Sequence, residues 1–323
     1  MARSTNFQKG SFYQKTLAGQ VRLSGIGVHS GAPAEIVLNP AESGTGIVFV
    51  RTDAGTGKGV EATWKSVTST ELCTVVSAAD GTSVSTIEHL MAALRAYEID
   101  NVVVEVDGPE MPIMDGSAAP FIEAFESVGI VAQAARRRQV RVLKPVRVAI
   151  GDGWGELHPS AETRFEIEID FPLAIIGRQE LSFDLTPEFF RTEIARARTF
   201  GRLQDVERLW AKGLARGSSL ENSVALDGER VLNPEGLRWS NEFVRHKALD
   251  AIGDLALAGM PIIGLYRSYK GGHRINAAIV EALFADETAF EIVEGSVPRR
   301  EPVQVHTGLA VGLARPAYGP ERT

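Results

Sequence analysis

The sequence predicts a soluble α+β protein whose two similar domains face one another. Its 323 residues exceed what a single hydrophobic core usually supports. A predicted helix containing His89 is followed by a turn and a strand at Val102–Val106. A predicted helix containing His246 is likewise followed by a turn and a strand at Ile262–Tyr266. One such helix–turn–strand unit in each half indicates two α+β domains.

The composition is that of an ordinary soluble protein, with 44% hydrophobic and 23% charged residues. The net charge of −7 argues against nucleic acid as a general partner. The single cysteine, Cys73, excludes an internal disulfide and fits a reducing cytoplasm. The first residues lack the apolar core of a signal peptide, and the longest apolar stretch, Leu255–Tyr266, is too short to span a bilayer. We therefore expect a cytoplasmic protein without an integral membrane segment.

Short strands and two helices are predicted in the first half. Residues up to Tyr13 look like a loose leader, and the three arginines in Ala134–Arg138 indicate a domain linker. The glycines of Gly25–Gly31 superficially suit a phosphate site, but no helix follows them, so we expect a tight strand connection instead. Apolar residues spaced as a helical stripe predict the helix at Ser85–Tyr97. The other predicted elements are strands at Gln20–Leu23, Ala34–Leu38, Ile47–Arg51 and Leu72–Ser77 and a helix at Pro120–Val128.

The second half also alternates strands with helices. Strands are predicted near Gln139–Ile150, Trp154–Leu157, Arg164–Asp170 and Ile262–Tyr266, and helices at Pro187–Ile194, Val206–Lys212, Phe243–Leu255 and Ala277–Phe284. The tail from Pro298 is rich in Pro, Gly and Arg, and we expect it to be poorly ordered.

The predicted helix at Phe243–Leu255 carries a polar stripe. His246, Asp250 and Asp254 recur every four residues, and Lys247 lies on the same side. A histidine and an aspartate one helical turn apart can hold a metal ion together. A solvated face with incidental charge pairs is the simpler interpretation of this helix taken alone. The opposite, core-facing side consists of Val244, Ala248, Ile252 and Leu255.

The first-half helix offers a third metal ligand. His89 points away from the apolar stripe, so it lies in solvent or faces another part of the protein. If the two helices meet, His89, His246 and Asp250 would supply three ligands and leave a fourth position open, as in catalytic zinc sites. Glu88 would then be placed to take a proton from water. The pattern Ser85-x-x-Glu88 fits a capping box equally well.

Two further polar residues are candidates for catalysis. His273 follows two glycines after a predicted strand, which indicates an exposed loop position. It is either a surface histidine or a general acid oriented by a carboxylate such as Asp254. Thr199 could donate a hydrogen bond to an oxyanion, although a threonine in a turn is commonplace.

Several long motifs together resemble one family, the UDP-3-O-acyl-N-acetylglucosamine deacetylases. These are zinc amidases that commit Gram-negative bacteria to lipid A synthesis. The motifs span nearly the whole chain in the order of the family. They are STIEHL (Ser85–Leu90), IDNVVVEV (Ile99–Val106), PEMPIMDGSAAPF (Pro109–Phe121), ARARTFG (Ala195–Gly201), FVRHKALDAIGDL (Phe243–Leu255) and the GGH that ends at His273.

The resemblance implies a set of roles for the catalytic residues. The zinc ligands would be His89, His246 and Asp250. Glu88 would be the general base. His273 would be the cationic acid, paired with Asp254, and Thr199 would match the hydroxyl on the oxyanion side.

The resemblance also implies a substrate site. Lys247 would lie near the substrate, and Phe200 would open an insert that forms a passage for the acyl chain. Asp115 is a candidate for orienting a residue that binds the zinc without binding it itself. Cys73 matches a cysteine beside the zinc that is not expected to be a required ligand. Arg202 departs from an apolar residue that some members carry after the TFG motif, which affects the mouth of the passage rather than the chemistry.

The implied reaction is hydrolysis of the N-acetyl group of UDP-3-O-(3-hydroxyacyl)-N-acetylglucosamine to acetate and UDP-3-O-acyl-glucosamine. The partner is then a small acylated nucleotide sugar, and the protein is expected to be a monomer. Two alternatives are a zinc hydrolase acting on another acetylated amine and a non-catalytic module that binds nucleotide sugars or lipids. An acyl passage argues against a peptidase, and a binding module would have no need of Glu88.

In the implied fold each domain is a sheet layered against helices and carries an insert, with the active site between the domains. The first domain would cover residues 1–136, with an insert at about 51–70, and would supply Glu88 and His89. The second would cover residues 139–297, with the passage-forming insert at about 199–224, and would supply His246, Asp250 and His273. Residues 298–323 would form a C-terminal tail.

Overall fold

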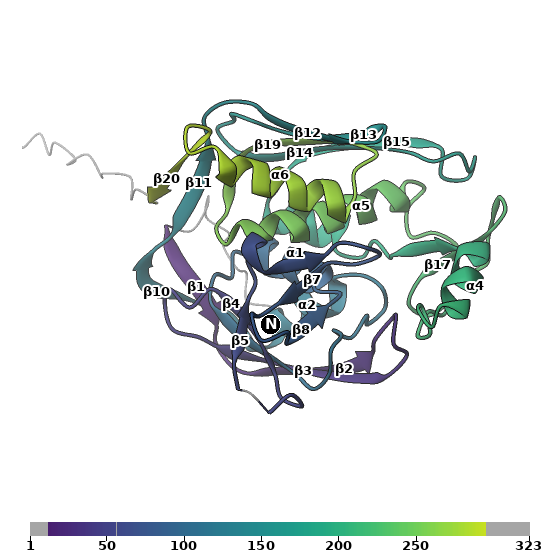
Figure 1. The fold of residues 1–323 in the computed structure, drawn as a ribbon, viewed down its shortest axis with the longest axis horizontal. Coiled ribbons are helices and arrows are strands. Elements are labelled where there is room, and N and C mark those ends of the chain that lie inside the picture. The colour runs from purple at the N-terminus through teal and green to yellow at the C-terminus, as the bar shows by residue number, and fades with distance from the viewer. Residues whose placement is uncertain (1–11, 56, 295–323) are drawn as a thin grey trace, which may run out of the picture.

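The computed structural model describes residues 12–55 and 57–294 (Figure 1). Within these residues every sheet draws its strands from one side of Arg137 only. The sheets and helices form layers, with a large sheet at each outer side and helices between them. This arrangement confirms the predicted α+β fold class.

The first half contains a five-stranded sheet of order β2-β3-β9-β4-β5, in which β9 and β4 are parallel and the other pairs antiparallel. The sequence VVVEV alternates buried and half-buried residues along β9, as a strand with one face against the core requires. Helix α2 packs on β2 and on α1. The bounds are β2 Val21–Ile26, β3 Pro33–Pro40, β4 Ile47–Arg51, β5 Gly59–Glu61, β9 Val102–Val106, α1 Glu88–Ala96 and α2 Ala119–Val128.

The second half contains a seven-stranded sheet of order β12-β13-β19-β11-β20, with β14 paired to β19 and β15 paired to β14. Helix α6 packs on β12 and β13, and α5 packs on β14 and β15, so both helices cover one face of this sheet (Figure 1). The bounds are β11 Arg138–Val142, β12 Val146–Ile150, β13 Gly153–His158, β14 Thr163–Asp170, β15 Arg178–Asp184, β19 Ile262–Tyr269, β20 Phe290–Glu294, α5 Glu242–Leu255 and α6 His273–Ala285.

Smaller elements complete the described chain. Strand β1 (Tyr13–Leu17) pairs with β10 (Ile130–Arg136). The remaining sheets are β6-β7-β8 (Val67–Ser69, Val75–Ser77, Ser83–Ser85) and β16-β17-β18 (Phe200–Arg202, Val224–Asp227, Arg230–Val231). The other helical segments are η1 (Trp64–Ser66), α3 (Pro187–Phe189), the π-helical η2 (Phe190–Ile194), α4 (Leu203–Ala211) and η3 (Ala256–Ala258).

The segment predicted as a domain linker, Ala134–Arg138, consists of the end of one strand, one buried residue and the start of another strand. Strand β10 runs to Arg136 and β11 starts at Arg138, and Arg137 between them is only 3% exposed. Its guanidinium forms ion pairs with Glu98 and Asp100, which hold this arginine inside the protein. The predicted domain limits stay a prediction. The leader and the tail at 298–323 lie outside the described residues, except that Tyr13 begins β1.

Helices α1 and α5 pack against each other between the outer sheets (Figure 1). A Cβ atom at Gly253 would lie 2.0 Å from the carbonyl oxygen of Glu88, so only glycine permits this approach. The polar stripe of α5 is buried in this contact, since His246, Asp250 and Asp254 are 3%, 2% and 1% exposed. The interpretation of the stripe as a solvated face is therefore wrong.

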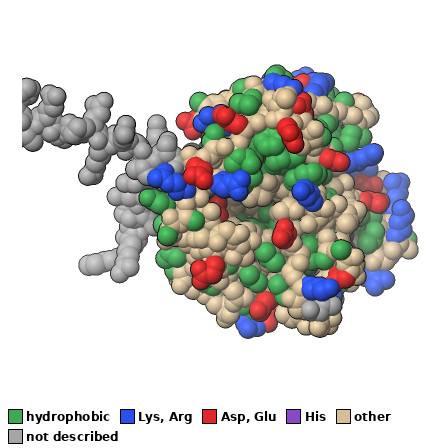
Figure 2. Space-filling view, turned by 60° about the vertical axis from the view of Figure 1, so that its left-hand side comes forward, with side chains coloured by type: hydrophobic (Ala, Val, Ile, Leu, Met, Phe, Trp, Pro, Cys, Tyr) green, Lys and Arg blue, Asp and Glu red, His purple; other side chains and the backbone are tan. Residues whose placement is uncertain are grey.

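The surface carries charges of both signs. On the face shown in Figure 2, Lys, Arg, Asp and Glu side chains are interspersed with apolar ones. In the part of the chain that the structure describes, no helix has both the length and the apolar character that crossing a bilayer requires.

We expect Gly253→Ala to destabilise the protein by about 1–3 kcal/mol, because the new methyl group overpacks the contact between α5 and α1. The free energy of unfolding in urea measures this effect. Gly108→Ala is the control, since a Cβ atom at Gly108 meets nothing within 4 Å. Equal stability of the two variants would contradict the role assigned to Gly253.

Candidate active site

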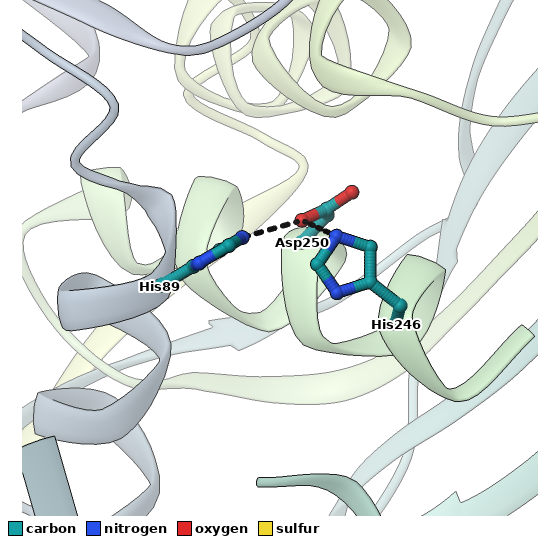
Figure 3. A group of neighbouring side chains, drawn as sticks. All are labelled: His89, His246 and Asp250. Carbon is teal, nitrogen blue, oxygen red and sulfur yellow. Dashed lines mark ion pairs between the residues drawn. The ribbon is translucent and has the colours of Figure 1, made fainter. Parts of the chain in front are cut away.

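Three buried side chains converge where α1 meets α5 (Figure 3). His89 comes from the first turn of α1, and His246 and Asp250 lie one turn apart on α5. The Oδ1 atom of Asp250 is 3.7 Å from Nε2 of His89 and 3.4 Å from Nε2 of His246. One ligand atom of each residue lies within 4.8 Å of the others, so the group could hold a metal ion.

The chemistry of these donors fits a metal. The Nδ1 atom of His246 is 3.1 Å from the carbonyl oxygen of Ala197, which accepts its proton and leaves the Nε2 lone pair free. Burial, reinforced by charge at His246, lowers the pKa of His89 to about 3, so this imidazole is neutral. Two neutral imidazoles and a carboxylate are a ligand set suited to Zn²⁺.

The carboxylate of Asp250 is oriented toward the same point. Its Oδ2 accepts a hydrogen bond of 2.8 Å from the ammonium of Lys247. Its Oδ1 is buried and has no hydrogen-bond partner among the described residues. A buried acceptor without a partner is costly, and a cation at this position would satisfy it.

Glu88 faces the same space and does not cap α1. The residue before α1 is Ile87, with no side-chain cap, and Ser85 belongs to β8. The Oε2 atom of Glu88 accepts a hydrogen bond of 3.1 Å from the backbone N–H of Thr74. The capping-box interpretation is therefore wrong. Burial raises the pKa of Glu88 to about 7, against the opposing charge of His273.

His273 is the first residue of α6, and its side chain is 11% exposed, so the predicted exposed loop is wrong. The helix begins earlier than predicted because the N–H of Asn276 donates to the carbonyl of Gly272 and closes the first turn. Nδ1 of His273 lies 2.9 Å from Oδ2 of Asp254, and Nε2 lies 3.9 Å from Oε1 of Glu88.

The protonation of His273 is set by its carboxylate partner. Burial alone would lower the pKa of this histidine, but the charge and the hydrogen bond of Asp254 raise it to about 9. His273 is therefore a cation at neutral pH, whereas His89 is neutral, although both belong to one site.

Sequence reasoning missed the residues that hold Asp254. Its Oδ1 accepts a hydrogen bond of 2.6 Å from the hydroxyl of Thr74, and its Oδ2 accepts one of 2.8 Å from Nδ2 of Asn276. Asn276 in turn accepts a bond of 2.6 Å from the hydroxyl of Tyr266. A helix start at His273 would have placed Asn276 on the same face one turn later, whereas no local pattern points to Thr74.

The segment before β16 is fixed by a buried ion pair that the sequence also did not reveal. The guanidinium of Arg198 is paired with Glu242, and the two side chains are 2% and 0% exposed. Next to it, the N–H of Thr199 donates to the carbonyl of Gly116, and the carbonyl of Thr199 accepts from Val224, both at 2.8 Å. Ala197 and Thr199 are thereby held against the rest of the site.

Many of these residues line one cavity with about 800 Å³ of space, part of it open to solvent. Its polar end contains Glu88, His89, His246, Lys247, Asp250 and His273. The lining also includes the apolar residues Val28, Leu72, Ile113, Phe200, Val206, Leu209 and Ala215, which we call the apolar end, together with His29, Thr86, Thr199, Ser218 and Ser223. The ring of Phe200 lies 6.1 Å from the ring of His246 and 4.9 Å from that of Phe243.

The structure also shows where Cys73, Asp115 and Arg202 lie. Cys73 lines the cavity, and burial together with the charge of Glu88 raises the pKa of its thiol to about 12, so it stays protonated. The carboxylate of Asp115 bonds to Ser117 and Arg238. Arg202 is exposed and pairs with Asp205.

A family model and several known proteins that are similar to this chain carry the same functional description. Residues 14–285 match the family model described as UDP-3-O-acyl N-acetylglycosamine deacetylase. A protein of Brucella ovis named UDP-3-O-acyl-N-acetylglucosamine deacetylase is 55% identical over 283 residues, which cover 87% of this chain and 99% of that protein. Proteins of the same name from Brucella abortus and Brucella melitensis are 55% and 54% identical with the same coverage.

We expect Asp254→Asn to lower the pKa of His273 from about 9 toward or below 6.5, since the neutral amide removes the charge that favours the imidazolium. Titration of the metal-free protein followed by NMR of labelled histidine measures the shift. His158, which lies on β13 and pairs with Glu156, provides an internal reference. An unchanged titration of His273 would contradict the assigned pairing.

Proposed function

The chain belongs to the UDP-3-O-acyl-N-acetylglucosamine deacetylase family, and we propose that it hydrolyses the N-acetyl group of UDP-3-O-(3-hydroxyacyl)-N-acetylglucosamine. The products are acetate and UDP-3-O-acyl-glucosamine, in the committed step of lipid A biosynthesis. The observation that carries this proposal is a single cavity in which a metal-binding group and an acid–base pair meet an apolar end. The alternatives considered above, another acetylated amine or a non-catalytic binding module, are not favoured.

His89, His246 and Asp250 are proposed to hold Zn²⁺, for which their donor atoms are suited. Bound there, the ion supplies a Lewis acid that polarises the acetamide carbonyl and lowers the pKa of water. Lys247 donates a hydrogen bond to Oδ2 of Asp250 and lines the cavity, so it is also placed to contact the substrate.

Glu88 is proposed as the general base. Its Oε2 is held by the N–H of Thr74, and its carboxylate lines the cavity beside the ligand His89. It takes the proton from the water that attacks the acetamide carbon. His273 is the general acid, because its Nδ1–H is bound to Asp254 and its Nε2–H faces the cavity.

Glu88 and His273 together account for the protons that the proposed reaction moves. As the tetrahedral intermediate collapses, the C–N bond breaks and the proton on Nε2 of His273 passes to the leaving amine. The proton held by Glu88 then restores His273, whose pKa is raised by the charge and the hydrogen bond of Asp254. The 3.9 Å between the two groups is bridged by one water or a small side-chain rotation.

Thr199 and the apolar end complete the substrate site. The hydroxyl of Thr199 is proposed to donate to the oxyanion of the tetrahedral intermediate, a contact worth about 3 kcal/mol in comparable sites. Phe200, Val206 and Leu209 belong to the insert at 199–224 and line the apolar end. We assign this end to the 3-O-acyl chain.

The remaining parts of the proposal concern the whole protein. We propose that it acts as a cytoplasmic monomer and that the domains divide at 136 and 139. The confinement of each sheet of the described residues to one side of Arg137 supports this division.

We expect the purified protein to hold about one zinc ion and to release acetate from the acylated substrate. Glu88→Ala should keep the metal yet lose about 100-fold or more in kcat, since the base is removed and the ligands are not. His246→Ala should weaken zinc binding. Metal analysis and an acetate-release assay with and without a chelator measure both effects, and a fully active Glu88→Ala would refute the mechanism.

We expect Val206→Trp to lower kcat/KM for a substrate with a long acyl chain by at least about tenfold, because blocking two methylenes removes roughly 1.6 kcal/mol of apolar burial. A substrate with a short acyl chain should be affected little. Glu207→Trp, the neighbouring exposed position on α4, is the matched control. Equal losses for both chain lengths would argue against a passage at α4.

A further inference from the structure

We propose that Thr74 is the positioning residue that sets the general acid against the general base. This inference rests on the proposed function of Glu88 and His273. Thr74 precedes β7 and is 1% exposed. Its backbone N–H donates to Oε2 of Glu88 at 3.1 Å, and its hydroxyl donates to Oδ1 of Asp254 at 2.6 Å.

The direction of the hydroxyl proton follows from its neighbours. Oγ1 of Thr74 lies 2.6 Å from the carboxylate of Asp254 and 3.4 Å from Nδ1 of His273. Nδ1 carries a proton that it donates to Oδ2 of Asp254, so it cannot accept another. The hydroxyl of Thr74 therefore donates to Oδ1.

This bond removes the last rotational freedom of Asp254. Oδ2 accepts from His273 and from Asn276, and Oδ1 accepts from Thr74, so both oxygens are held from different directions. A fixed carboxylate fixes the imidazole ring that it binds. The orientation of Nε2 of His273 toward the cavity thus depends on a hydroxyl that does not touch the substrate.

Thr74 also connects the two halves of the chain. Glu88 lies on α1 in the first half, whereas Asp254 and His273 lie on α5 and α6 in the second. One residue bonds the base through its backbone and the partner of the acid through its side chain. Thr74 is thus bonded on both sides of the 3.9 Å gap between Glu88 and His273.

The two contacts can be separated experimentally, because only the hydroxyl is lost on substitution. The backbone of Thr74 is held independently, since its carbonyl accepts from the N–H of Thr86 at 3.1 Å. Thr74→Val keeps the shape and removes the donor, and Thr74→Ser keeps the donor and removes the methyl group. Thr16→Val is the matched control. Thr16 lies on β1, is also buried, and donates a hydrogen bond of 2.6 Å from its hydroxyl to the carbonyl oxygen of Asn101.

The experiment measures kcat, KM and zinc content for the four zinc-loaded proteins, together with crystal structures of the two Thr74 variants. Thr74→Val should lose about 10- to 100-fold in kcat, with KM and zinc content unchanged. Thr74→Ser should retain most of the wild-type kcat, and Thr16→Val should match the wild type. If Thr74→Val does not fold, Thr74→Ala replaces it as the variant without the hydroxyl.

Each outcome decides the inference. Wild-type kcat in folded Thr74→Val, or equal losses in Thr74→Val and Thr74→Ser, would overturn it while leaving the proposed function intact. If the wild type itself releases no acetate, the proposed function fails, and the crystal structures decide the positioning. Displacement of Asp254 and His273 in Thr74→Val but not in Thr74→Ser supports the positioning role, and unchanged positions in both overturn it.

Discussion

The close approach of α5 to the carbonyl of Glu88 is the constraint on which the site depends. Gly253 allows it, since a Cβ atom there would lie 2.0 Å from that oxygen. Glu88 and His89 are adjacent in the first turn of α1, and Asp250 and Asp254 lie within one turn of Gly253 on α5. One backbone contact therefore brings His89 to Asp250 and the proposed base Glu88 to Asp254, the partner of the proposed acid. The site is placed by helix packing, which is more rigid than placement by loops.

The surroundings of His89 and His273, rather than their residue type, give the two histidines different protonation states. His89 and His273 are both buried, and burial favours the neutral imidazole in each case. Only His273 is hydrogen-bonded to a carboxylate that is itself held by further donors, and its pKa rises to about 9 while that of His89 falls to about 3. One histidine can consequently offer a lone pair and the other a proton, as the proposed mechanism requires.

The periodicity of the sequence predicts part of the fold and of the site. The four-residue spacing of His246, Asp250 and Asp254 indicated one helical face, and the alternating sequence of β9 indicated its strand. The pattern left open whether His89 meets that face, because contact between distant helices is not local information; the family resemblance supplied it. Local patterns misled at Ser85-x-x-Glu88, where a bond from Thr74 replaces the cap, and at His273, where a helix starts directly after two glycines. The same lack of local signal concealed Thr74 itself.

The two ends of the cavity differ in how firmly they are built. The polar end rests on α1, α5 and α6, where the hydrogen-bonded side chains of Glu88, His246, Asp250 and Asp254 are at most 4% exposed. The apolar end rests partly on α4, in which no residue is fully buried and Val206 and Leu209 remain half exposed along the cavity. An acyl chain lying there would remove this apolar surface from water, so the ligand would complete the packing that the helix lacks. If this end holds the acyl chain, as proposed, changes in α4 can alter the preference for chain length while the distances between Glu88, Asp250 and Asp254 stay as α1 and α5 set them.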